Sequence, residues 1–135
     1  MQYLLDTNAV IALLNDPAGP ISRKLHSLSP TDIAISAVVL HELYFGAFKS
    51  ARRDHNLSIV EALQFQTLEL DMNDARHSGE IRAWLAARGT PIGPFDVLIA
   101  GQARARGMTL VSHNLREFAR VPGLKTVTWR PIAPH

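Results

Sequence analysis

The strongest constraint on the fold is that short apolar segments alternate with longer segments of helical periodicity along the whole chain. In the longer segments, apolar residues recur at steps of three and four, which is typical of amphipathic helices. The short segments have the composition of buried strands and cover residues 3–5, 33–35, 67–70, 109–111 and 125–129. This alternation predicts a three-layer α/β/α sandwich around a central, mostly parallel sheet of four to five strands.

Capping and turn residues divide the predicted helices. Ser36 and Asn73 carry short polar side chains of the kind that cap helix N-termini, and Gly89 and Gly107 are typical helix stops. We expect one domain over 1–135, with a loose, proline-rich tail over about 130–135. The expected helices cover residues 9–14, 20–28, 37–50, 54–65, 73–88, 96–106 and 114–118.

Composition excludes several classes of site. The 135 residues include no cysteine, which rules out disulfides, thiolate metal sites and thiol nucleophiles. The net charge of +2 permits a polyanionic partner without requiring one. The N-terminal residues lack the pattern of a signal peptide, and the apolar runs are shorter than the roughly 20 residues of a membrane span. We therefore expect a soluble, cytoplasmic protein with no membrane association.

Acidic and polar side chains stand where the predicted strands end or the next helices begin. Asp6 follows the first strand, and Ser112 and Asn114 follow the fourth. Asp96 opens the helix before the fourth strand, and Glu42 lies in the helix after the second. Because ligands of such folds sit beyond the carboxyl ends of the strands, we expect these groups to share one crevice.

A cluster of carboxylates in one crevice indicates a hard divalent cation. Mg²⁺ and Mn²⁺ prefer carboxylate oxygens and water, and such an ion offsets the repulsion between neighbouring acids. Simpler roles remain open for the same residues. Asp6 and Asp96 are equally suited to capping helices, and Glu42 to the edge of a buried helix face.

Three segments of the sequence carry motifs that occur together in one known protein family. Residues 3–8 read YLLDTN, and residues 35–47 read ISAVVLHELYFGA. Residues 88–124 contain PFDVLIA followed by TLVSHN and REF, which are similar to the third and fourth sequence blocks of that family. The three segments resemble the PIN-domain ribonucleases, and in particular the VapC-type toxins of type II toxin–antitoxin systems. The resemblance extends over residues 3–129 and implies a PIN-like fold.

The resemblance also implies roles for individual residues. Asp6 and Asp96 match the metal-binding acids, and Glu42 matches the acid of the second block. Many PIN domains have a further acid where this chain has Asn114, which is a departure from the pattern. Glu117, one helical turn later, is the alternative fourth catalytic acid.

The same resemblance implies a Mg²⁺-dependent endoribonuclease, with Mn²⁺ able to substitute, that cuts tRNA or rRNA. Ser112 would support the site, and His113 is an additional candidate for RNA contact. The implied partners are a VapB-like antitoxin, seated against the helices before residue 66, and a second copy of the chain. Operator DNA would be bound only by the toxin–antitoxin complex. Candidate RNA contacts are the basic residues Lys49, Arg52, Arg53, Arg82 and Arg104.

Three other functional hypotheses compete with this one. The first is a catalytically weak PIN-fold module that binds nucleic acid or regulates, and the Asn114 departure is compatible with it. The second is a DNA-directed flap-type nuclease, for which the chain is short. The third is a hydrolase of small molecules, but the sequence has neither a G-x-S-x-G motif nor a phosphate-binding loop.

Overall fold

The computed structural model describes residues 2–129, and these form one parallel sheet flanked by helices. The sheet has five strands in the order β3-β2-β1-β4-β5, and every neighbouring pair is parallel. The predicted α/β class is therefore confirmed, with all strands parallel rather than most of them. The strands are β1 (Tyr3–Leu5), β2 (Ile33–Ser36), β3 (Gln66–Leu68), β4 (Thr109–Val111) and β5 (Lys125–Val127).

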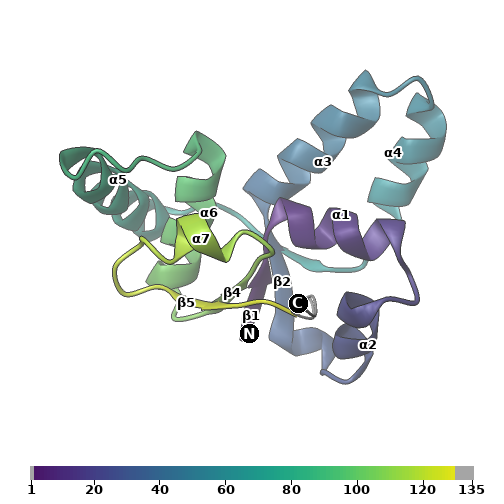
Figure 1. Cartoon of the computed structure of the whole chain (residues 1–135). Coiled ribbons are helices and arrows are strands. Elements are labelled where there is room, and N and C mark those ends of the chain that lie inside the picture. Colours follow the sequence, from purple (N-terminus) through teal and green to yellow (C-terminus); the bar gives the residue numbers. More distant parts are fainter. Residues whose placement is uncertain (1, 130–135) are drawn as a thin grey trace, which may run out of the picture.

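Helices lie on both sides of the sheet. Figure 1 shows α1 and α2 on one side and α5 and α6 on the other, while α3 and α4 rise together as an arm away from the strands. The predicted loose tail over 130–135 lies outside the described residues. Within residues 2–129, no helix is both long and apolar enough to cross a membrane. The helices are α1 (Thr7–Asn15), α2 (Pro20–His26), the 3₁₀ helix η1 (Pro30–Asp32), α3 (Ala37–Lys49), α4 (Arg53–Glu61), α5 (Met72–Ala87), α6 (Pro94–Ala105) and α7 (Leu115–Phe118).

The order of the strands fixes where a ligand site can form. The chain passes from β1 through β2 to β3 on one side, and then returns to place β4 on the other side of β1. The direction of winding thus reverses between β1 and β4. Open parallel sheets bind ligands beyond the carboxyl ends of the strands at such a switch point.

Several helix boundaries differ from those predicted. The N-cap of α5 is Asp71 rather than Asn73, because Asp71 and Asp74 accept hydrogen bonds from each other's backbone N–H in a capping box. Helix α4 ends at Glu61, short of the predicted Phe65. Asp96 does not cap α6, since that helix begins at Pro94 with Gly93 as its N-cap.

Close packing of α5 against α6 fixes the helix that carries Asp96. A Cβ atom added to Gly101 of α6 would lie 2.0 Å from Ser78 Oγ and 2.6 Å from the Ser78 backbone nitrogen. Only glycine fits at this crossing. Nearby, the side chain of Asp74 is 1% exposed and accepts hydrogen bonds from Arg106 and Gln102, each at 2.9 Å. The Arg106 guanidinium contributes to holding the pKa of Asp74 below its ordinary value, against the opposing effect of burial.

Candidate active site

Asp6 lies at the end of β1, between two strands and a helix. Its backbone N–H donates to the Val111 carbonyl at 3.0 Å, which ties it to β4. Its Oδ1 accepts a hydrogen bond from the Ala9 N–H at 2.8 Å, so Asp6 also caps α1. The residue is 3% exposed. Burial raises the pKa of Asp6, although hydrogen bonds from Ser112 and Ala9 and the charge of His113 act to lower it.

Glu42 is held beside Asp6 by the first residue of α1. The Thr7 hydroxyl donates to Glu42 Oε1 at 2.8 Å and so links α1 to α3 across 35 residues of sequence. Glu42 is half-buried. Its charge is one of the influences that raise the pKa of Asp6, which indicates that the two carboxylates share one electrostatic environment.

Asp96 lies in the first turn of α6, after a segment that contains two prolines. A Cβ added to Gly93 would lie 3.1 Å from Asp96 Oδ2, so the absence of a side chain at Gly93 leaves room for this carboxylate. Burial, followed by the charges of three other acids, raises the pKa of Asp96 to about 6. Those acids are Asp6, Glu42 and Glu117.

The segment after β4 contributes the remaining candidates. Ser112 is fully buried, and its Oγ accepts a hydrogen bond from the Asn114 N–H at 2.8 Å. Ser112 thus stabilises the turn into α7 and also bonds to Asp6. Asn114 is the N-cap residue of α7 but makes no side-chain capping bond. Glu117, in α7, is close enough for its charge to raise the pKa of Asp96.

The arrangement therefore gathers four carboxylates from four helices or strand ends around the switch point of the sheet. Within residues 2–129, no three or more His, Asp or Glu side chains lie close enough together to hold one ion directly. Mg²⁺ is usually bound through one or two carboxylates and keeps several waters. Two acids with raised pKa values, Asp6 and Asp96, fit that kind of binding because a cation would stabilise their charged forms.

Residues 3–124 match the PIN domain family. The chain belongs to the PIN-domain family. A tRNA(fMet)-specific endonuclease VapC from Salmonella typhimurium is 40% identical to it over 131 residues, which cover 96% of this chain and 98% of that protein. Its counterpart from Shigella flexneri is 42% identical over 132 residues, with coverage of 96% and 98%. This PIN domain is thus of the VapC type.

Solved structures of VapC-type proteins have the same fold. DNA-bound VapBC from Salmonella typhimurium contains a chain that superposes with a TM-score of 0.91 at 40% identity, covering 96% of this chain and 99% of that one. VapBC2 from Rickettsia felis, bound to a DNA fragment from its promoter, gives a TM-score of 0.90 at 33% identity, with coverage of 96% and 100%. Both likenesses extend over nearly the whole PIN domain.

The basic residues of the PIN domain divide into exposed and engaged groups. Lys49, Arg52 and Arg53 are exposed around the turn between α3 and α4, and Arg82 is exposed on α5. Arg104 is different. Its side chain is 13% exposed and is held by Glu80, by His77 Nδ1 at 2.9 Å and by the Pro122 carbonyl at 3.1 Å. These contacts argue against Arg104 as an RNA contact, because its guanidinium joins α5, α6 and the turn before β5.

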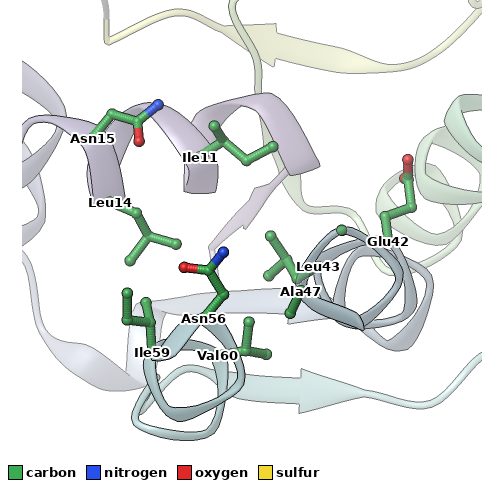
Figure 2. Close-up of a pocket in the computed structure, with 10 residues that line it drawn as sticks. Ile11, Leu14, Asn15, Glu42, Leu43, Ala47, Asn56, Ile59 and Val60 are labelled. Atoms are coloured by element: carbon green, nitrogen blue, oxygen red, sulfur yellow. The ribbon is translucent and has the colours of Figure 1, made fainter. Parts of the chain in front are cut away.

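An apolar groove runs between α1 and the arm of the PIN domain. It encloses about 260 Å³. Figure 2 shows Leu14 of α1 facing Ile59 and Val60 of α4, while Glu42 lies at the edge and points away from these apolar side chains. The groove thus borders the acidic site. Its lining residues are Ile11, Leu14, Asn15, Glu42, Leu43, Gly46, Ala47, Asn56, Ile59 and Val60.

Sequence reasoning missed one feature beside the acids. Phe95 is 44% exposed, and its ring meets that of His41 with centroids 5.5 Å apart. Each ring immediately precedes a candidate acid, Asp96 or Glu42. The sequence does contain an indication that Phe95 is exposed. It lies between Pro94 and Asp96 at the start of a helix, where an apolar side chain is poorly placed to be buried in the core.

Proposed function

We propose that this protein is the toxin of a type II toxin–antitoxin pair and a Mg²⁺-dependent endoribonuclease. The convergence of Asp6, Glu42, Asp96 and Glu117 at the switch point of the sheet carries the proposal. Membership of the VapC group supports it, since relatives from Salmonella typhimurium and Shigella flexneri are named tRNA(fMet)-specific endonucleases. These names favour tRNA over rRNA as the substrate class here.

Asp6 and Asp96 are the residues that would hold Mg²⁺, with Mn²⁺ as a substitute. When bound, the cation supplies Lewis-acid stabilisation of the charge that develops on the phosphodiester. Glu42, fixed by the Thr7 hydroxyl, and Glu117 present carboxylate oxygens that accept hydrogen bonds from water and so orient it. Ser112 keeps Asp6 in position through their hydrogen bond. Asn114 adds a neutral amide at the same rim.

The groove between α1, α3 and α4 is the proposed seat of the antitoxin. Its apolar lining suits the apolar face of a helix. The solved relatives from Salmonella typhimurium and Rickettsia felis are VapBC assemblies bound to DNA. Because Glu42 stands at the edge of the groove, a segment that lies in it can continue to the acids and obstruct them. We propose that the complex, as a dimer of toxins, binds operator DNA.

The test is cleavage of total tRNA and rRNA by the purified, antitoxin-free protein, with Mg²⁺ or with EDTA. We expect discrete tRNA fragments in Mg²⁺, none in EDTA, and at least about a 100-fold lower rate for Asp96→Asn. Glu61→Gln, which changes an exposed acid at the end of α4, is the matched control and should cleave at the wild-type rate. Cleavage that persists in EDTA or in Asp96→Asn would refute the assignment.

The second candidate is a catalytically weak module that binds nucleic acid. Asn114 favours it, because a neutral amide stands where many PIN domains have an acid. In the same assay, this candidate predicts no cleavage with either metal. It also predicts that tRNA binding, measured by filter retention, is the same for the wild type and Asp96→Asn.

A further inference from the structure

Two aromatic rings from different helices meet beside the acidic site. His41 precedes Glu42 on α3, and Phe95 precedes Asp96 on α6. The ring centroids are 5.5 Å apart and the planes are inclined at 60°, an edge-to-face contact. The pair therefore joins the same two helices that carry two of the candidate catalytic acids.

Phe95 remains at the surface although it is strongly apolar. It is 44% exposed, and His41 is exposed as well. Pro94 restricts the backbone immediately before it, at the start of α6. A ring held in this way by a fixed backbone and by a neighbouring ring loses little conformational entropy when a flat ligand covers it.

Other large exposed aromatic side chains are placed differently. The Trp84 ring is covered by the Arg88 guanidinium, which lies 3.4 Å from its centroid. Phe45 and Phe48 are exposed in the second half of α3, toward the end of the arm. Among the exposed large apolar side chains of residues 2–129, Phe95 is the one adjacent in sequence to a candidate acid.

An aromatic ring beside the negatively charged site can attract a nucleotide through its base and not through its phosphate. Without a bound cation, four carboxylates repel the phosphates of an RNA strand, so attraction beside them then has to come from an uncharged part of the nucleotide. A base stacked on an aromatic side chain contributes about 1–3 kcal/mol and tolerates any sequence. An unpaired base in an RNA loop is free to make such a contact.

We propose that Phe95, supported by His41, is the stacking platform for one unpaired base next to the bond that is cut. This inference rests on the proposed ribonuclease function and adds a substrate-binding residue to it. Stacking on Phe95 holds the strand at the start of α6, one residue from Asp96. It selects for unstacked nucleotides rather than for a particular base.

The first test places a fluorophore at the platform. In Phe95→Trp, a short oligoadenylate added in EDTA should quench the tryptophan emission with saturation. The wild type, which contains Trp84 and Trp129, provides the background to subtract. The proposal is overturned if the variant is quenched no more than the wild type.

The second test removes the ring. Phe95→Leu should bind tRNA, and cleave it by kcat/KM, at least about tenfold more weakly, whereas Phe95→Tyr should retain wild-type values. Phe48→Leu, at a 53% exposed aromatic residue on α3, is the matched control and should behave as the wild type. If Phe95→Leu changes the oligomeric state in sedimentation while its RNA affinity is unchanged, the ring belongs to an interface between copies and the proposal fails. Because the quenching titration needs no cleavage, an inactive wild type would count against the proposed function alone.

Discussion

At the scale of single residues, Asp96 shows how the candidate site lowers the stability of the folded protein. Its carboxylate is partly removed from water and faces three other acids, so its charged form is disfavoured in the folded, metal-free protein. An unfolded chain imposes neither burial nor these neighbours. Functional residues commonly reduce stability in this way, because the arrangement that binds a cation is unfavourable without it.

We therefore expect Asp96→Asn to be more stable than the wild type in EDTA at pH 7, by on the order of 1 kcal/mol after allowance for solvent screening. The folded pKa of about 6 lies above the unfolded value near 3.8, so the folded state binds more protons between these limits. Wild-type stability should fall relative to Asp96→Asn as pH rises from about 4 to 6, and the difference should stay constant above that. Urea denaturation of both proteins at a series of pH values measures this difference in stability. A variant less stable than the wild type at pH 7 would contradict the conclusion that burial and the neighbouring acids disfavour the charged form of Asp96.

At the scale of elements, the α5–α6 pair carries Asp96 into the site. The crossing at Gly101 and Ser78 leaves no space for a side chain, and the ion pair between the buried Asp74 and the exposed Arg106 fixes the far end of α6. The error in the predicted start of α5 has a local cause. Asn73 and Asp71 are both suitable caps in isolation, and the reciprocal bonds between Asp71 and Asp74 decide between them.

Gly101→Ala should lower the free energy of unfolding by about 3 kcal/mol, because the added methyl group meets the backbone of Ser78, which cannot move away without separating the helices. Gly79→Ala is the matched control on α5, since a Cβ there meets nothing within 4 Å. That change should raise stability by about 0.5–1 kcal/mol. Chemical denaturation of both variants gives the comparison, and equal effects would show that the crossing is not tight.

At the scale of the whole molecule, the groove and the acidic site meet at Glu42. One face of α3 contributes Leu43 and Ala47 to the groove, while Glu42 bonds to Thr7 at the site. A partner seated in the groove therefore reaches the site without any change in the fold. We therefore expect that a substitution on α3 can weaken antitoxin binding without changing the rate of tRNA cleavage.

Gly46 allows these two properties to be separated, because it lines the groove and a Cβ atom added there would meet no atom within 4 Å. Gly46→Trp should fill the groove and weaken binding of the cognate antitoxin by at least about 100-fold, while tRNA cleavage in Mg²⁺ stays at the wild-type rate. Gly46→Ala should bind the antitoxin normally. Isothermal titration calorimetry and the cleavage assay together check both statements. Undiminished antitoxin binding by Gly46→Trp would place the antitoxin elsewhere.

The sequence by itself determined the fold class, the approximate position of all five strands and the identity of the candidate acids. Apolar periodicity and strand-end positions are local properties, and the family motifs around Asp6, Glu42 and Asp96 lie in continuous segments. Only the tertiary structure decided that Arg104 is engaged within the fold and that Phe95 and His41 meet beside the acids. These features depend on contacts between residues far apart in sequence, and such contacts are set by how the helices pack on the sheet.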